Sequence, residues 1–302
     1  YGKDNIELKI IGNNFYECLQ ESLEFSIYHN FTHIHPYDDL DIIEGQSTIC
    51  KEIIEQIDNK IDIISCCVGG GGLISGMVEY NKKNNCNIKI IGGEPENANS
   101  LYLSLKNNRP TRIDNLDTFV DGASVSQVGE NNFHILKNSL SKDDIFVISN
   151  GKICNELLNM YGEDGIILEP AGVLSVCAME QYIKVNNIKN KNIVCILSGG
   201  NNDISRYPEI IEKNKIYLVK KKYYIIKFLQ KPKQLKKFII NALGSKDDIT
   251  RFEYIKKTNT NYGNVLLGIE SDNFVELEEN LIKNNFEFQK IEPNDLIYSY
   301  LI

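Results

Sequence analysis

Short aliphatic and β-branched runs alternate with longer amphipathic stretches through the first two thirds of the chain. The short runs predict strands buried on both faces of a sheet, and the stretches predict helices that bury one face. Strands are expected at 7–11, 31–34, 61–68, 88–92, 145–148 and 193–197, and helices at 15–28, 43–56, 73–83, 130–140, 151–161 and 171–185. This alternation predicts an α/β fold with a mostly parallel, doubly wound sheet.

The pattern changes after Tyr207-Pro208. A charged segment, interpreted as a helix end plus linker, precedes strands expected at 223–229, 249–255, 264–269 and 286–291 and helices expected at 232–243 and 274–284. The order β-α-β-β-α-β is that of the ferredoxin-like motif. The sequence therefore predicts a first domain at 1–212, a linker at 213–222 and a smaller α+β domain at 223–302.

Composition narrows the class of protein. A hydrophobic fraction of 42% and a charged fraction of 25% are typical of a globular domain. No apolar run approaches the roughly 18 residues of a membrane span, so no membrane association is expected. The net charge of -8 disfavours nucleic acid as a partner, because neutralising phosphates requires a basic surface.

The eight cysteines do not form a recognisable disulfide or zinc framework. Cys66, Cys67 and Cys195 lie inside apolar runs, where cysteine behaves as a small hydrophobic residue. There is no C-x-x-C pair, so the four histidines lack the cysteine partners of a zinc-finger spacing. We therefore expect a reduced, cytoplasmic protein.

Four consecutive glycines, Gly69, Gly70, Gly71 and Gly72, followed by Leu73, join a predicted strand to a predicted helix. Consecutive glycines let backbone N–H groups converge, and the helix adds the positive end of its dipole, which together favour an anion site. The alternative is a flexible strand–helix turn without a ligand.

Nucleotide motifs fit this loop poorly. Gly71 and Gly76 have the glycine spacing of a P-loop, but Met77 occupies the place of the lysine, and no register gives G-x-G-x-x-G. Glu94 ends the next strand in a position suited to a ribose-binding acid, so dinucleotide binding remains a weaker alternative.

Two further segments lie where ligands bind in open α/β sheets. Ser198 and two glycines follow the strand expected at 193–197, and Glu169 precedes a helix in the sequence Glu-Pro-Ala-Gly. Taken singly, the first could be a turn with a helix cap and the second a helix N-terminal acid favoured by the macrodipole.

Together, the glycine loop, the E-P-A-G segment and the S-G-G-N segment resemble the fold type II pyridoxal phosphate (PLP) enzymes, the tryptophan synthase β-like group, and among them the threonine dehydratases. The likeness extends to segments along the whole chain: 45–48, 93–95, 120–125, 197–206 and 247–254. The last resembles part of the single ACT-like regulatory domain of the shorter biosynthetic dehydratases.

The resemblance implies a role for each matching residue. The backbone of Gly69–Leu73 would hold the PLP phosphate, Ser198 would meet the pyridine nitrogen, Gly122 would line the cofactor, and Glu169 would face the substrate. The implied reaction is β-elimination of L-threonine to 2-oxobutanoate and ammonia, the first step of isoleucine biosynthesis. The resemblance also implies a homo-oligomer and an isoleucine or valine effector at the second domain.

The catalytic lysine motif of the family, S-x-K-x-R-G-A, does not occur in the chain. Ser104-Leu-Lys106 imitates its beginning but follows the glycine loop and lacks R-G-A, so we reject Lys106 as the Schiff-base lysine. Because the chain begins with Tyr1, we expect the lysine and its motif to lie upstream, and we expect the chain by itself to have no dehydratase activity.

Two departures from the family pattern concern metal binding and regulation. Relatives bind a divalent cation with a glutamate, a backbone carbonyl and a second acid; here Glu94 and Ala98 match, but Ser100 replaces the acid, so no metal site is expected. The regulatory segment R-P-G-A-L reads Lys231-Pro-Lys-Gln-Leu235. A side chain in place of that glycine is expected to weaken effector binding.

Besides the weaker alternative of a dinucleotide-dependent oxidoreductase, two alternatives to a threonine dehydratase stay open. One is an L-serine dehydratase or another fold type II lyase, and the other is a truncated, non-catalytic protein that binds an amino acid.

Overall fold

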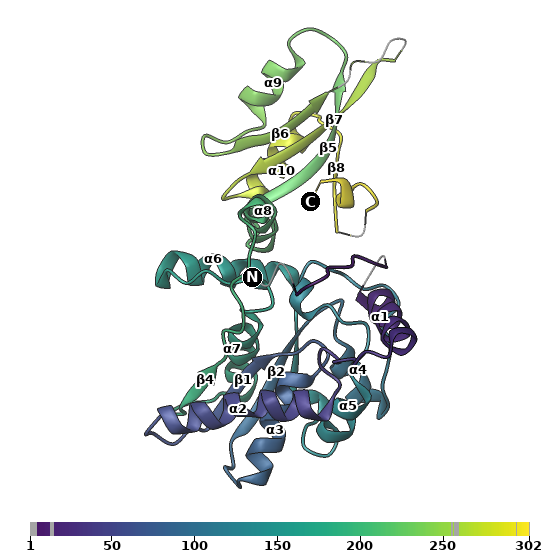
Figure 1. The fold of residues 1–302 in the computed structure, drawn as a ribbon. Coiled ribbons are helices and arrows are strands. Elements are labelled where there is room, and N and C mark those ends of the chain that lie inside the picture. Colours follow the sequence, from purple (N-terminus) through teal and green to yellow (C-terminus); the bar gives the residue numbers. More distant parts are fainter. Residues whose placement is uncertain (1–4, 13–14, 255, 257–259, 294, 302) are drawn as a thin grey trace. The chain divides into compact units, whose positions relative to one another are not determined.

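The computed structural model describes residues 5–12, 15–254, 256, 260–293 and 295–301. The chain divides into two compact units, Tyr1–Asn202 and Asp203–Ile302 (Figure 1). No helix among the described residues is both long and apolar enough to cross a membrane.

A parallel sheet forms the centre of the first unit, which confirms the predicted α/β class. Its strands are β1 (Ile63–Cys67), β2 (Lys89–Pro95), β3 (Ile145–Ile148) and β4 (Ile193–Cys195). They lie in the order β3-β2-β1-β4. The chain therefore moves outward from β1 to β2 and β3 and then crosses back to the other side of β1. This reversal makes the carboxyl ends of β1 and β4 the topological switch point of the sheet.

Helices cover both faces of this sheet (Figure 1). Alternate residues of a strand point to opposite faces. Ile64 and Cys66 of β1 belong to the hydrophobic cluster with α2 (Leu40–Gln56) and α3 (Gly72–Lys83). Ser65 points to the other face, where its hydroxyl donates to the Ser175 carbonyl of α7 (Leu174–Asn186) at 2.7 Å.

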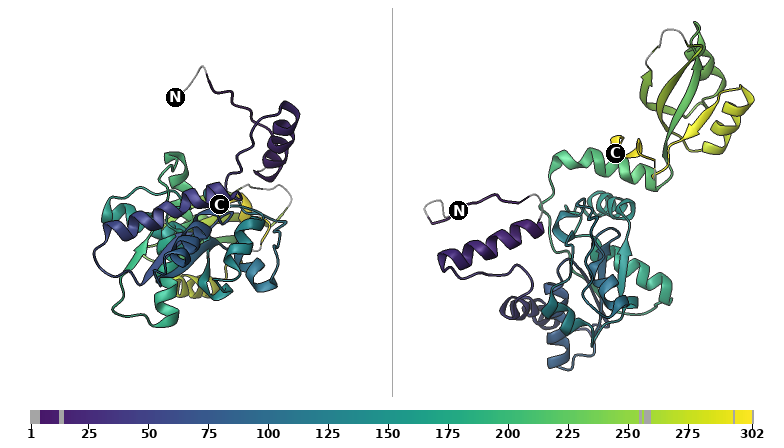
Figure 2. Two further views of the ribbon diagram at one scale, coloured as in Figure 1. Left: turned by 60° about the horizontal axis from the view of Figure 1, so that its bottom comes forward. Right: turned by 90° about the vertical axis from the view of Figure 1, so that its right-hand side faces the viewer.

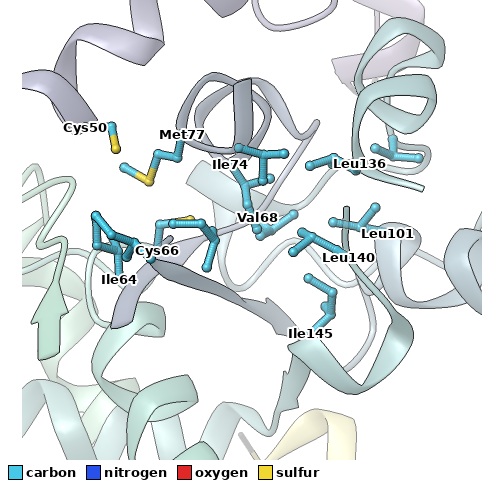
Figure 3. Packing of buried hydrophobic residues seen from close by; sticks show 14 of the residues in the cluster. Cys50, Ile64, Cys66, Val68, Ile74, Met77, Leu101, Leu136, Leu140 and Ile145 are labelled. Carbon is cyan, nitrogen blue, oxygen red and sulfur yellow. The ribbon is translucent and has the colours of Figure 1, made fainter. Parts of the chain in front are cut away.

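The main hydrophobic cluster explains why the predicted strands are so continuously apolar. Ile64, Ile74, Met77 and Leu101 are fully buried and come from a strand and two helices (Figure 3). Burying one such side chain stabilises the fold by about 1.5–3 kcal/mol. The cluster therefore fixes α3 on β1, and with it the loop that joins them.

Two predicted strands, 7–11 and 31–34, are wrong. Neither segment has regular secondary structure, and Ile10 and Ile34 are exposed by 89% and 71%. A β-branched run becomes a strand only where a neighbouring strand pairs with it, and no described strand lies beside these segments. The helix between them, α1 (Phe15–His29), forms as predicted and extends from the rest of its unit (Figure 2).

The remaining helices of this unit are α4 (Ser100–Asn107), α5 (Glu130–Leu136) and α6 (Asn150–Asp164). The sequence did not predict α4. Its cap comes from outside the helix, since the Glu94 carboxylate accepts the N–H groups of Leu101 and Tyr102, both at 2.8 Å. A helix of this length depends on such tertiary contacts, which local sequence does not reveal.

The second unit begins with α8 (Tyr207–Tyr217) and continues as the predicted β-α-β-β-α-β motif. Its elements are β5 (Lys221–Leu229), α9 (Gln234–Asn241), β6 (Asp248–Tyr254), β7 (Tyr262–Glu270), α10 (Phe274–Lys283) and β8 (Phe288–Lys290). The strands form an antiparallel sheet in the order β6-β7-β5-β8, which confirms the ferredoxin-like prediction. Residue 255, at the end of one predicted strand, lies outside the described residues.

The charged segment 213–222 is more ordered than a linker. Its beginning lies in α8, and β5 starts at Lys221. Lys215 pairs with Glu270 at 2.7 Å and Lys221 with Glu212 at 2.7 Å, so two of its lysines are held in ion pairs. The domain limits 1–212 and 223–302 stay a prediction.

Candidate active site

A cavity of about 410 Å³ opens at the carboxyl end of β1, beside the switch point. Its wall combines the glycine loop 69–73, the aromatic ring of Tyr37 ahead of α2, and the segment 121–125. Ligands of open α/β sheets bind at this place in the topology. The sequence had identified the glycine loop and Gly122 on separate grounds, and the fold brings them to one cavity.

The glycine loop is closely packed. A β-carbon at Gly70 would collide with the Tyr37 ring, and one at Gly72 would lie 3.0 Å from the Tyr37 carbonyl oxygen. Gly71 has φ +98°, in the region that glycine adopts without strain. Close packing on one side and a left-handed turn explain why glycine occupies consecutive positions.

The loop presents its backbone donors at the start of a helix. Because α3 begins at Gly72, the N–H groups of its first turn have no intrahelical acceptor. The helix dipole adds partial positive charge at the same place. This arrangement is suited to an anion with several acceptor oxygens, such as a phosphate group.

Asn132 of α5 is a part of this region that the sequence analysis missed. Its side chain is fully buried and donates to the Tyr37 carbonyl at 2.9 Å and to the Gly70 carbonyl at 3.2 Å. The only sequence signal was an amide among the apolar positions of a predicted helix, next to Phe133. Its partners are 62 and 95 residues away in the chain.

Glu169 and the two other predicted loops come together. A β-carbon at Gly199 would collide with the Glu169 carboxylate, and one at Gly122 would lie 3.1 Å from Glu169 Oε1. The Glu169 N–H donates to the Gly199 carbonyl at 3.1 Å, so the E-P-A-G and S-G-G-N segments are bonded to each other. The carboxylate therefore lies between Gly122 and Gly199.

Ser198 lies in the same region, at the end of β4. Its exposed hydroxyl is 3.2 Å from the Sγ atom of Cys67, which lines the cavity. Burial raises the pKa of the Cys67 thiol, more than the hydrogen bond with Ser198 lowers it. The thiol is therefore protonated at neutral pH and is able to donate to Ser198, which leaves the serine O–H free to donate to a ligand.

Glu94 has a structural task instead of the ribose contact considered from the sequence. It is fully buried, and both oxygens of its carboxyl group accept N–H groups of α4. Burial raises its pKa to about 8, against the opposing effect of those two hydrogen bonds.

The metal candidates Glu94 and Ala98 take part in local hydrogen bonds, and Ala98 donates its N–H to the Pro95 carbonyl at 3.0 Å. No group of three or more His, Cys, Asp or Glu side chains suited to a metal occurs among the described residues.

The cavity fits PLP in the parts that the described residues supply. The close packing of the loop on Tyr37 leaves no space for a side chain at Gly70, and the N–H donors of the loop match a phosphate. A hydroxyl at Ser198 is suited to a pyridine nitrogen. No lysine is among the described residues that line the cavity, and Lys106 is exposed on α4, in agreement with its rejection.

Comparison with known proteins gives two family matches that together span most of the chain. The model described as "Pyridoxal-phosphate dependent enzyme" matches residues 1–199. The model of the C-terminal regulatory domain of threonine dehydratase matches residues 212–301.

Curated relatives agree along the whole length. The chain is 42% identical over 305 residues to the biosynthetic L-threonine dehydratase IlvA of Halalkalibacterium halodurans, covering 100% of this chain and 72% of that protein. It is 41% identical over 309 residues to the Staphylococcus epidermidis enzyme of the same name, with the same coverage.

Solved structures give the same result. Threonine deaminase isoform 2 of Solanum lycopersicum matches with a TM-score of 0.63 and 36% identity, covering 68% of this chain and 59% of that chain. The serine racemase of Dictyostelium discoideum matches with a TM-score of 0.54 and 30% identity, covering 64% and 60%. With these matches, the chain belongs to the pyridoxal-phosphate-dependent enzymes and, by its dehydratase-type regulatory domain, to the threonine dehydratases among them.

Proposed function

We propose that the protein carrying this chain converts L-threonine to 2-oxobutanoate and ammonia by β-elimination, as the first step of isoleucine biosynthesis in the cytoplasm. The supporting observation is that Gly69–Leu73 and Gly122 meet at one cavity, with Glu169 fixed against Gly122. The dehydratases that it matches extend further than this chain, which spans 72% of their length. The proposal therefore concerns the protein as a whole.

The glycine loop would bind the cofactor phosphate. The N–H groups of Gly71, Gly72 and Leu73 lie at or before the first turn of α3, where they are available to an external acceptor. Charge-assisted hydrogen bonds of this kind are stronger than neutral ones. Phosphate binding at the glycine loop would anchor one end of the cofactor and leave its ring to be bound by other residues.

Ser198 would donate to the pyridine nitrogen. PLP supplies electron withdrawal that acidifies the Cα–H bond of a bound amino acid. A neutral hydroxyl does not keep the pyridine nitrogen protonated as a carboxylate would, so the electron withdrawal is weaker. Elimination of a β-hydroxyl group tolerates this better than transamination does, which is in keeping with a lyase.

Glu169 would act on the substrate side, and Gly122 would support the cofactor through its backbone. The carboxylate is held against both Gly122 and Gly199, so it has a defined place beside the cavity. From that place it would hydrogen-bond the polar groups of the amino acid and orient its β-hydroxyl. Such orientation is effective in catalysis only when the group is held in advance.

The second unit would carry regulation. We propose that an ACT-like domain at 223–302, joined by 213–222 to a catalytic domain at 1–212, binds isoleucine or valine in a homo-oligomer. The match to a threonine dehydratase regulatory domain over residues 212–301 supports this. Lys233 retains the left-handed backbone, φ +71°, at the position where the family pattern has glycine.

The test measures 2-oxobutanoate from L-threonine and pyruvate from L-serine with the PLP-loaded protein that carries this chain. We expect a higher kcat/KM for threonine and a loss in Ser198→Ala but not in the control Ser245→Ala, an exposed serine of the second unit. Absence of both products, with amino-acid binding retained, would instead indicate a non-catalytic binding protein.

A serine-specific lyase is the second candidate, because the structural neighbours include a serine racemase at 30% identity. A higher kcat/KM for L-serine than for L-threonine would favour it and overturn the proposed substrate.

A further inference from the structure

The Asn132 side chain connects three parts of the cavity wall. Its Nδ2 atom lies 2.9 Å from the Tyr37 carbonyl, 3.2 Å from the Gly70 carbonyl and 3.4 Å from Asp38 Oδ1. Three acceptors around one end of the amide establish which end is nitrogen. The other end, Oδ1, is buried and has no hydrogen-bond partner among the described residues.

Asn132 therefore forms its side-chain hydrogen bonds through its NH₂ group and not through its oxygen. A buried carbonyl oxygen without a partner is unfavourable, and an apolar side chain of similar size would avoid it. Retaining an amide at this position is therefore explained by its donors, which hold the Tyr37 and Gly70 carbonyls.

Holding the Gly70 carbonyl determines the direction of the next N–H group. The same carbonyl oxygen also accepts the Gly129 N–H at 3.0 Å, so both hydrogen bonds pull it toward α5. In a trans peptide the C=O of one residue and the N–H of the next point in opposite directions. The Gly71 N–H is therefore directed away from α5.

The position of Asn132 is itself fixed. The Asp38 carboxylate accepts the N–H of Glu130 at 2.9 Å and that of Asn132 at 3.2 Å, and so caps the first turn of α5. A β-carbon at Gly71 would lie 3.1 Å from Asn132 Cβ, so the loop and α5 are in close contact. Tyr37, Gly70 and α5 form a connected frame with Asn132 at its centre.

We propose that Asn132 is a positioning residue of the phosphate cradle, which directs the Gly71 N–H toward the bound phosphate by holding the Gly70 carbonyl on the opposite side. The inference rests on the proposed function, because it requires that the glycine loop bind phosphate. Asn132 itself touches neither cofactor nor substrate.

The test compares pyridoxine 5′-phosphate with pyridoxine, by calorimetry on the cofactor-free protein that carries this chain. Neither ligand has an aldehyde, so neither reacts with lysines. In Asn132→Ala we expect affinity for the phosphorylated ligand to fall about tenfold, since one charge-assisted hydrogen bond loses its alignment. Affinity for pyridoxine should stay within about twofold of the wild type, because a twofold change in affinity corresponds to less free energy than one hydrogen bond contributes.

The control is Asn131→Ala. Asn131 is the preceding residue of α5, is exposed, and contacts Asp38 but not Gly70. It should change neither affinity. An equal loss for both ligands in Asn132→Ala would indicate a general structural role and overturn the positioning role.

The two proposals fail separately. If the wild type binds both ligands equally, the phosphate cradle is overturned and the role of Asn132 with it. If the wild type prefers the phosphorylated ligand and Asn132→Ala keeps that preference, only the role of Asn132 is overturned.

A second measurement uses only the wild-type protein. The amide resonance of Gly71 in the wild type should shift on titration with pyridoxine 5′-phosphate and stay unchanged with pyridoxine. Absence of a phosphate-dependent shift at Gly71 would contradict the proposed direction of its N–H group.

Discussion

Lys233 gives the clearest test of backbone strain in the regulatory unit. It precedes α9 with φ +71° and ψ 6°, a left-handed conformation, although it is not glycine. Its side chain is exposed, and its carbonyl accepts the N–H of Lys237. The substitution Lys233→Gly removes the side chain without changing the backbone that the turn requires.

The magnitude follows from two opposing contributions. A left-handed conformation costs a residue with a β-carbon about 1–2 kcal/mol. Glycine costs about 0.4–1 kcal/mol through the greater freedom of the unfolded chain. Lys233→Gly should therefore stabilise the second unit by about 0.5–1 kcal/mol, which corresponds to a rise in Tm of about 2–8 °C for a unit of this size.

The assay is hydrogen exchange of the β5 amides in the whole protein, together with thermal unfolding. Lys231→Gly is the control, because it removes the same charge at a nearby position outside the left-handed region. The control should be less stable than the wild type by about 0.4–1 kcal/mol. If Lys233→Gly is destabilised as much as Lys231→Gly, the left-handed backbone carries no strain and the reasoning is wrong.

Three further predictions concern the first unit. Gly70→Ala should lower affinity for pyridoxine 5′-phosphate, measured by calorimetry, by about tenfold or more, because overpacking against Tyr37 costs about 1–3 kcal/mol. Adding Tyr37→Ala to the same chain should restore part of the lost affinity. Glu94→Gln should flatten the pH dependence of the free energy of unfolding, measured in urea, because burial raises the Glu94 pKa from 4.5 to about 8. The stabilising contribution of Glu94 is full below pH 4.5 and is lost as the pH rises through 8. An unchanged pH profile in Glu94→Gln would contradict this prediction. Ser198→Asp should lower kcat/KM for L-threonine by about tenfold or more, a change of at least about 1.4 kcal/mol in activation free energy, and a rate equal to that of the wild type would refute the role given to the neutral hydroxyl.

The sequence predicted the elements whose burial is repetitive. The strand at 145–148 has the predicted limits, and α1 differs from its prediction by one residue at the end. The helix expected at 130–140 stops at Leu136 because the chain turns there, with Ser139 and Leu140 both donating to the Leu136 carbonyl. Apolar periodicity continues through such a turn, so it does not locate the end of the helix.

Contacts between distant segments were beyond the reach of the sequence. The pattern identified Gly69–Leu73 and Ser198 because they follow buried strands, and Glu169 because an acid before a helix is visible locally. The pattern gave no reason to connect Asn132 with Gly70. It also suggested that Glu94 binds a ligand, whereas in the fold Glu94 caps α4. In both cases the decisive partner comes from another element.

The packing of the glycines also decides between the two interpretations of the loop after β1. A flexible turn would leave space around its glycines, whereas β-carbons at Gly70 and Gly72 would meet Tyr37 and one at Gly71 would meet Asn132. The same holds at Gly199 against Glu169. These glycines permit close approach of backbone to side chain, and the hydrogen bonds to the Gly70 carbonyl fix the loop before any ligand binds. A loop fixed in advance loses little conformational entropy on binding, so more of the phosphate interaction is retained as affinity.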